Sequence, residues 1–282
     1  MGIFDGCLLA CDIDGTLLIN DCIPQQNIEK IKYFVSEGGN FALATGRTAG
    51  AVSAVTRQID CIGPSIVANG SMIFDFINDT ALYSVSVPED DKHIVKAVID
   101  GCETVGVEAH SGKKVLAINS NQESIDHQEY EDLDVIQISY KDALKYEWNK
   151  VIYLFANEHE SKTVKQIVSQ FEHNSQFVDT SAVIYGRRRY YYEHVPCGVS
   201  KATTLKTLCE MLKIKKGCCY AIGDYYNDLE MIKAADIGAA LADSPDEVKA
   251  VADKVVCDVQ NGAVADFIDY LTERKLNNGS KF

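Results

Sequence analysis

Residues 8–16 read LLACDIDGT and are the most informative stretch of the chain. The four apolar residues predict a buried β-strand, and Asp12 and Asp14 follow it two positions apart. Two carboxylates this close raise each other's pKa unless a cation or a charged ligand compensates them. Gly15 and Thr16 predict a tight turn whose backbone N–H can approach a phosphate. We therefore expect a metal-assisted site at the end of this strand.

Strands and helices alternate after this stretch. Apolar residues at helical spacing predict helices over residues 24–37 and 52–59, and residues 41–44 and 65–68 read as short buried strands. Strand, helix, strand, helix, strand with short connections is typical of a parallel sheet covered on both faces.

The pattern changes after Gly70. Two strand-like runs flank Asn78-Asp79 and predict a β-hairpin. Residues 89–190 then mix helix and strand candidates, and the strand-helix alternation returns from Ser200. The candidates in the middle segment are helices at 91–105 and 161–171 and strands at 114–118, 135–139, 151–156 and 183–192.

This order predicts an α/β fold with an insertion. We expect a doubly wound, mostly parallel, Rossmann-like core sheet formed by residues 1–84 and 191–282. Residues 85–190 would form a smaller inserted α+β cap domain, within the usual size range of domains.

Composition limits the possible partners. With 282 residues and 46% hydrophobic content, the chain can bury a large core. The net charge of -14 argues against a nucleic-acid partner, because such binding depends on a basic surface. No run approaches the ~20 apolar residues that cross a bilayer, and the N-terminus lacks a secretory pattern. We expect a cytoplasmic protein with no membrane partner, either a monomer or a small homo-oligomer.

The ten cysteines are scattered and form no Cys-x-x-Cys pair. Reduced thiols are the simpler interpretation, and we favour a structural role over a redox role. The six histidines show no helical ligand spacing, so a zinc site is not expected.

Four polar clusters lie where the sheet would present its strand ends or where a helix would start. Ligands of open α/β sheets bind at the carboxyl ends of the strands. Each cluster alone is weak support, but their joint occurrence in this order is hard to obtain by chance. The clusters are Asp12/Asp14, Thr45-Gly46-Arg47, Lys201 and Asp224/Asn227/Asp228.

These clusters resemble the four motifs of the haloacid dehalogenase superfamily. Residues 67–70, which precede the hairpin, look like the corresponding segment of the Cof-type phosphatases, which carry an α+β (type IIB) cap. The resemblance implies a phosphoric monoester hydrolase that uses Mg²⁺ to act on a small phosphorylated metabolite. Sugar phosphates are the leading class, followed by pyridoxal phosphate and nucleotides such as flavin mononucleotide.

Chemical roles can be given to the carboxylates. Asp12 would attack phosphorus and form an aspartyl-phosphate, and Asp14 would protonate the leaving group and later deprotonate water. Mg²⁺ would be bound by Asp12, Asp224 and a backbone carbonyl, that of Asp14. Asp228 would orient this shell rather than bind the ion directly.

The other site candidates are expected to contact phosphate or substrate. Lys201 supplies a point charge, and Thr45 supplies a hydroxyl. Arg47 would either reach substrate or pair within the core, and Asn227 would contact phosphate or Lys201, with phosphate favoured. The full set is Thr45, Gly46, Arg47, Asn69, Lys201 and Asn227.

An unusual run of three arginines and three tyrosines occupies residues 187–192. In a strand, Arg187, Arg189 and Tyr191 would share one side. The favoured interpretation is a solvated face of the insertion, and the alternative is a cap surface that faces an anionic or aromatic substrate.

Two other functions remain open at this stage. A phosphosugar mutase would return the phosphoryl group to another hydroxyl, and a receiver-like module would use a similar acidic cluster for signalling without turnover. The position of the acceptor on the first strand and the domain-sized insertion disfavour the receiver-like module.

Overall fold

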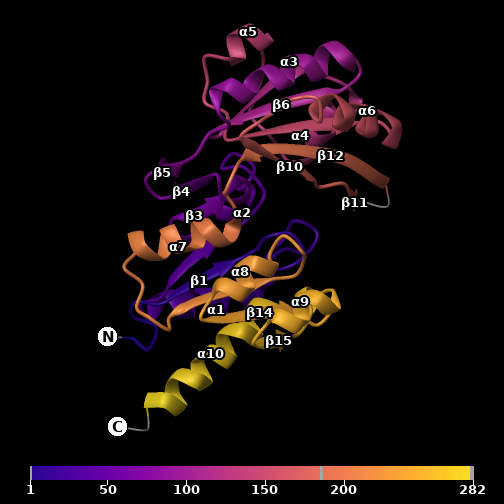
Figure 1. Ribbon diagram of the computed structural model, residues 1–282. Helices are drawn as coiled ribbons and strands as arrows, with labels where there is room; N and C mark the ends of the chain where they lie inside the picture. The colour runs from indigo at the N-terminus through magenta and orange to yellow at the C-terminus, as the bar shows by residue number, and fades with distance from the viewer. Residues whose placement is uncertain (1, 185–186, 280–282) are drawn as a thin grey trace. The chain divides into compact units, whose positions relative to one another are not determined.

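The computed structural model describes residues 2–184 and 187–279 (Figure 1). The chain divides into two compact units. The core unit comprises Met1–Arg47, Val52–Tyr83 and Ser200–Phe282, and the cap unit comprises Thr48–Ala51 and Ser84–Val199.

The insertion extends further along the chain than the sequence suggested. Its expected end at residue 190 falls inside strand β12 (Arg187–Pro196). This strand pairs on one side with β9 (Lys150–Phe155) through residues 190–194, so the ladder continues past the expected boundary. The cap unit therefore ends at Val199.

The core unit is built on a five-stranded sheet in which every neighbouring pair is parallel. All four residues of β1 are buried, as expected for a strand covered on both faces. The predicted α/β core with a parallel sheet is confirmed. In spatial order the strands are β15 (Lys254–Val256), β14 (Ile237–Leu241), β13 (Cys219–Gly223), β1 (Leu8–Cys11) and β2 (Asn40–Leu43).

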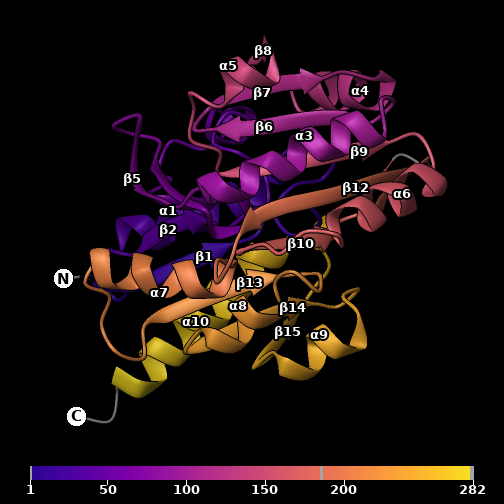
Figure 2. The ribbon, with the colours of Figure 1, turned by 45° about the horizontal axis from the view of Figure 1, so that its top comes forward.

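Helices cover both faces of this sheet (Figure 2). α1 and α10 pack against each other, while α8 packs on α7, β13 and β14. Leu8 and Ala10 of β1 contact Leu205 and Met231 in the apolar layer on the α7 and α8 side. The core helices are α1 (Gln25–Ser36), α2 (Ser53–Thr56), α7 (Lys201–Met211), α8 (Leu229–Ala234), α9 (Asp246–Val251) and α10 (Ala263–Gly279), with a short 3-10 helix η3 (Val259–Asn261).

One strand is placed differently from the expectation. β3 (Ser65–Val67) was expected to be the third strand of the parallel sheet, but it pairs antiparallel with β4 (Met72–Asp75). β5 (Thr80–Ser84) completes a separate three-stranded sheet. The turn η1 (Ala68–Gly70) has positive φ at all three residues and reverses the chain at once. β4 therefore pairs with β3, which keeps only an isolated parallel bridge to Ala44.

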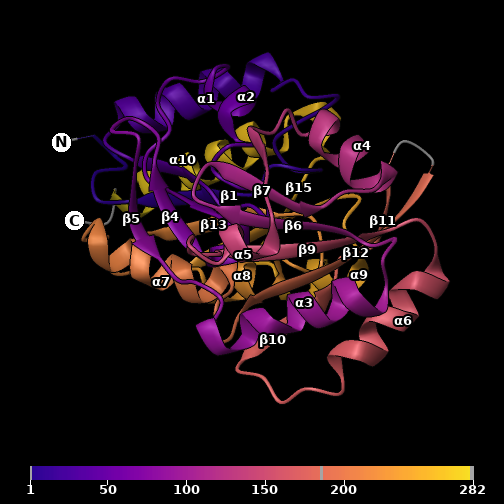
Figure 3. The ribbon, with the colours of Figure 1, turned by 90° about the horizontal axis from the view of Figure 1, so that it is seen from above.

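The cap unit contains a seven-stranded sheet. Helices α3 and α6 pack together on one face, and α4 contacts β6 and β9 (Figure 3). The elements β6, β10, α4 and α5 were not expected from the sequence. The remaining cap elements are η2 (Glu89–Asp91), α3 (Lys92–Gly101), β6 (Gly106–Ser111), β7 (Lys114–Asn119), α4 (Gln122–Tyr130), β8 (Val135–Gln137), α5 (Tyr140–Ala143), α6 (Glu158–Val168), β10 (Ser175–Asp179) and β11 (Ala182–Ile184).

The strand expected over residues 183–192 corresponds to two strands, β11 and β12, which pair antiparallel. Residues 185 and 186 between them lie outside the described part of the chain. Within residues 2–184 and 187–279, no helix combines the length and apolar character needed to span a bilayer.

A buried histidine makes the cap sensitive to acid. His194 of β12 is fully buried and stacks on Phe177, with ring centroids 4.3 Å apart. Its Nε2 has no hydrogen-bond partner among the described residues. Burial lowers the pKa of His194 to about 3, despite the opposing charge of Asp91. As the pH falls below the ordinary histidine pKa, the imidazole of His194 is protonated in the unfolded chain but stays neutral in the folded chain. Acid therefore favours the unfolded state.

We predict that cap stability falls by about 2–3 kcal/mol between pH 6.5 and pH 4.5 through His194, at ~1.4 kcal/mol per pH unit. The substitution His194→Phe should remove most of this dependence of the free energy of unfolding on pH. The only tryptophan, Trp148, is fully buried in the cap, so its fluorescence during urea unfolding reports the transition. The exposed His159 provides the control variant His159→Phe, which should keep the wild-type slope. Equal slopes in all three proteins would contradict the assignment.

Candidate active site

Two neighbouring parallel strands bring the acidic motifs together. β1 pairs with β13 in a register that places Cys11 beside Ile222. The Asp12 N–H donates to the Ile222 carbonyl at 3.0 Å and extends this ladder by one residue. Asp12 and Asp224, which directly follow the two strands, therefore lie at the same edge of the sheet.

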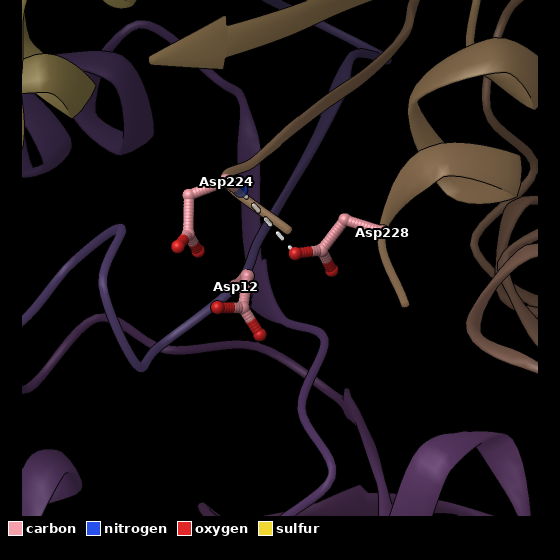
Figure 4. Close-up of side chains that lie close together, drawn as sticks. All are labelled: Asp12, Asp224 and Asp228. Atoms are coloured by element: carbon pink, nitrogen blue, oxygen red, sulfur yellow. Dashed lines mark hydrogen bonds between the residues drawn. The ribbon is translucent and has the colours of Figure 1, made fainter. Parts of the chain in front are cut away.

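Three carboxylates converge at this edge (Figure 4). In the described part of the chain, Asp12, Asp224 and Asp228 each offer an oxygen, and these oxygens lie within 4.8 Å of one another. Asp12 is 4% exposed and Asp228 is fully buried. Carboxylate oxygens are the ligands that Mg²⁺ prefers, so the donor set fits a divalent cation.

Lys201 lies against two of these carboxylates. Its Nζ is 2.6 Å from Asp12 Oδ1 and 2.7 Å from Asp228 Oδ1, and its side chain is 2% exposed. Burial opposes the charged form, but the two carboxylates outweigh it and raise the pKa of Lys201. The ammonium group is therefore charged.

The start of α7 fixes the position of this lysine. Lys201 is the first residue of the helix, and Ser200 caps the helix in a reciprocal capping box with Thr203. One turn on, the Thr204 hydroxyl donates to the Gly70 carbonyl at 2.7 Å. The helix N-terminus is thus tied to the turn that follows β3.

One ammonium group does not balance three carboxylates. Burial raises the pKa of Asp12 well above its usual range, and the Asp228 charge adds to the effect. Burial also raises the pKa of Asp224 to about 6. The raised pKa values mean that ionising these buried carboxyl groups is unfavourable. A divalent cation would offset this by stabilising both ionised carboxylates.

Asp228 has hydrogen bonds at both of its oxygens. Oδ1 accepts from Lys201, while Oδ2 accepts from the backbone N–H groups of Asp224 and Tyr225 at 3.3 and 3.4 Å. These contacts orient the loop and the lysine, and the role of Asp228 beside a bound metal ion stays a prediction.

Gly15 and Thr16 have a role that the sequence did not indicate. The Thr16 hydroxyl donates to Asp224 Oδ1 at 2.8 Å. Gly15 has a φ of +85°, and a Cβ added there would lie 2.5 Å from Asp224 Oδ2. The predicted approach of a backbone N–H of this turn to phosphate stays a prediction, while the structure places the Thr16 hydroxyl and the Cβ position of Gly15 against the Asp224 carboxylate. Their position directly after Asp14 is the only sequence signal for this contact.

Asp14 is not part of the cluster formed by Asp12, Asp224 and Asp228. Its side chain is 56% exposed, and Arg47 binds it in a bidentate pair with N–O distances of 2.6 and 2.9 Å. Of the two roles considered for Arg47, the structure shows the pairing within the core unit. The exposure of Asp14 suits a group that exchanges protons with a leaving group and with water.

Three predicted substrate contacts lie together beside β2 and β3. Thr45 is 1% exposed, its hydroxyl accepts the Arg47 N–H at 3.1 Å, and its carbonyl accepts the Asn69 N–H at 3.0 Å. A Cβ added to Gly46 would lie 3.0 Å from Asn69 Oδ1. Asn227 is exposed in the loop after β13, and its contact with phosphate stays a prediction.

The arginine run lies in the cap unit and is paired there. Arg189 Nη1 lies 2.6 Å from a Glu123 carboxylate oxygen and 3.0 Å from one of Asp126, and Arg187 pairs with the same two residues. The ring of Tyr191 also contacts α4, so the three side chains share one face as expected. The charges of both arginines are thus compensated within the cap, so a role in binding an anion has no support from these contacts.

Comparison with known proteins points to one family. The family model for haloacid dehalogenase-like hydrolases matches residues 9–268. A putative phosphatase of Mycoplasma pneumoniae is 26% identical over 265 residues, covering 87% of this chain and 88% of its own. A 5-amino-6-(5-phospho-D-ribitylamino)uracil phosphatase of Bacillus subtilis is 25% identical over 271 residues, covering 93% and 96%.

The fold agrees with this match. The crystal structure of a haloacid dehalogenase-like hydrolase from Bacteroides thetaiotaomicron superposes with a TM-score of 0.83 at 20% identity, covering 94% of this chain and 99% of the other. The parallel core sheet, the inserted α+β unit and the acidic edge of the sheet all agree with the resemblance seen in the motifs. The chain therefore belongs to the haloacid dehalogenase-like hydrolases.

Proposed function

We propose that the chain is a Mg²⁺-dependent phosphatase that hydrolyses a small phosphorylated metabolite through an aspartyl-phosphate on Asp12. The observation that supports this best is the cluster of the Asp12, Asp224 and Asp228 carboxylates, in which Lys201 supplies one ammonium group within the described part of the chain. This cluster is short of positive charge, and a phosphate monoester brings two further negative charges. A divalent cation would make the approach of two anions favourable.

The Asp12 and Asp224 carboxylates would hold Mg²⁺ together with the backbone carbonyl of Asp14. When bound, the ion would neutralise negative charge and polarise the phosphoryl oxygens. Lys201, the Thr45 hydroxyl and the Gly46 N–H would hold the remaining phosphoryl oxygens. These donors sit on helix and strand ends that are already fixed, so little reorganisation is needed during the reaction.

Asp12 and Asp14 have different roles in the two steps of the proposed reaction. An Asp12 oxygen forms a bond to phosphorus, the bond to the leaving oxygen breaks, and Asp14 donates a proton to that oxygen. Asp14 then takes a proton from water, the water oxygen bonds to phosphorus, and the bond to Asp12 breaks. Arg47 holds the Asp14 carboxylate through both of its oxygens and so orients it for these transfers.

A sugar phosphate is the leading substrate class, with pyridoxal phosphate and nucleotides as the next candidates. The Bacillus subtilis relative is named for a substrate whose phosphate sits on a ribityl chain, which is close to a sugar phosphate in chemistry. Cytoplasmic location, the absence of nucleic-acid and membrane partners, and a monomeric or small homo-oligomeric state stay predictions. None of the contacts among residues 2–184 and 187–279 favours the mutase or the receiver-like module.

The substitution Asp12→Asn should lower phosphate release at least about a thousandfold, because it removes the attacking oxygen's charge. The measurement is phosphate release from a panel of phosphorylated sugars, nucleotides and pyridoxal phosphate with Mg²⁺ present. Asp90→Asn, at an exposed position in the cap, is the control and should keep wild-type rates. Circular dichroism verifies that each variant is folded. Comparable turnover by Asp12→Asn would rule out the nucleophile assignment.

A pair of glycine variants tests the role of Asp224. Gly15→Ala places a methyl group against the Asp224 carboxylate, so the Mg²⁺ concentration for half-maximal activity should rise by about 10–100-fold. Gly217 has a similar φ of +79° but open space around its Cβ position. Both alanine variants should lose about 1–2 kcal/mol of stability from the left-handed backbone, but Gly217→Ala should keep the wild-type Mg²⁺ requirement.

Excess chelator should stop activity in the wild type and in both glycine variants, and added Mg²⁺ should restore it. An unchanged Mg²⁺ requirement in Gly15→Ala, or full turnover in chelator, would contradict the metal site.

A further inference from the structure

Two consecutive cysteines lie where β13 begins: Cys218 directly precedes the strand and Cys219 is its first residue. Each lies close to a second thiol. Successive side chains of a strand point to opposite faces of the sheet, so Cys218 and Cys219 face different layers. Cys218 contacts the thiol of Cys7, which directly precedes β1. Cys219 contacts the thiol of Cys209 from α7, in the apolar layer beneath that helix.

The strand register explains the first contact. Leu8 lies beside Cys219, and the Leu8 N–H donates to the Cys218 carbonyl at 2.9 Å. Cys7 therefore lies alongside Cys218 with its side chain on the same face. Neighbouring strands are separated by about 4.7–4.9 Å, which is within the range of about 4.4–6.8 Å between the Cα atoms of a disulfide. The register therefore places the two cysteines as direct neighbours on adjacent strands.

A cation and a phenol complete the first cluster. The Lys275 ammonium of α10 donates to Cys218 Sγ at 3.3 Å and also contacts Cys7. Cys7 Sγ lies 3.7 Å from the Tyr220 hydroxyl. Burial raises the pKa of the Cys7 thiol, and the ammonium group is placed to stabilise the negative charge that an attacking sulfur carries. Cys218 is 8% exposed, whereas Cys7 is fully buried, so a small oxidant reaches Cys218 first.

The second thiol pair has a carboxylate rather than an ammonium group as its charged neighbour. The Asp236 carboxylate accepts the Cys219 N–H at 2.9 Å. The contact with Cys209 and burial raise the pKa of Cys219, and the Asp236 charge adds to the effect, whereas the hydrogen bond with Cys219 lowers the pKa of Cys209. The Cys209 and Cys219 pair is therefore an internal comparison, because it has the same proximity of thiols but no ammonium contact of this kind among the contacts described.

We propose that Cys7 and Cys218 form an oxidisable dithiol outside the active site, converted by hydrogen peroxide to a disulfide that joins β1 to β13. The Cys218 thiolate attacks one peroxide oxygen, the O–O bond breaks, and the released hydroxide takes up a proton to leave as water. The Cys7 sulfur then attacks the sulfenic sulfur, the S–O bond breaks, and a second water leaves. Two thiols and one peroxide give one disulfide and two waters.

The test uses the full-length reduced protein treated with hydrogen peroxide and then alkylated under denaturing conditions. Peptide mass mapping should find Cys7 cross-linked to Cys218, with the loss of two hydrogens, and thiol reductant should reverse the change. Lys275→Met should slow this oxidation by about tenfold or more at neutral pH, because the ammonium group that stabilises negative charge on the attacking sulfur is lost. Lys233→Met, at an exposed position on α8, should keep the wild-type rate.

The cross-link itself should raise the urea midpoint of the core unit, since it restrains the unfolded chain. Preferential formation of the Cys209–Cys219 disulfide would overturn the proposal. So would over-oxidation of Cys218 without a cross-link, or equal oxidation rates in Lys275→Met and the wild type. Peptide mapping of the wild-type protein alone detects a Cys209–Cys219 disulfide or over-oxidation of Cys218, so the test does not depend on any variant folding.

Discussion

The interaction on which the site depends is the buried contact of Lys201 with Asp12 and Asp228. It joins three segments that are far apart in the chain: the end of β1, the start of α7 and the loop after β13. Removing one partner of a buried ion pair typically costs about 3–5 kcal/mol, because the other charge is left uncompensated. The pairing of β1 with β13 fixes two of these segments, and the capping box together with the turn at Gly70 fixes the start of α7. The acidic edge of the sheet therefore exists only when the N-terminal and C-terminal stretches of the core unit fold together.

The sequence predicted the features that depend on local patterns. Continuous apolar runs identified β1 and β14, and motif order brought Asp12, Lys201 and Asp224 to one edge of the sheet. The pairing of β3 was wrong because a short buried run looks the same in a parallel sheet and in a hairpin, and the turn at residues 68–70 decides between them. In the cap, β6 was not expected because one of its two faces carries the polar residues Glu108 and His110, although both are buried.

The side-chain pairings of the site were harder to predict than its location. Thr16 and Asp224 lie far apart in sequence, and their bond depends on the left-handed backbone of Gly15. The pairing of Arg47 with Asp14 was one of two open alternatives, because a long side chain has many rotamers and the sequence does not select one. Motif spacing gives the neighbourhood of a residue, but turn geometry and rotamers decide its partner.

The boundary of the cap also affects how Lys201 is held. The cap unit ends at Val199, the capping residue Ser200 follows, and the helix begins with Lys201. Gly198, just before this boundary, has a φ of +75° and open space around its Cβ position. Within three residues, the chain thus passes from a glycine with a left-handed backbone to Ser200, which is held by the two hydrogen bonds of the capping box. The backbone hydrogen bonds that set the direction of the Lys201 side chain therefore all lie within the core unit and begin directly after the linker.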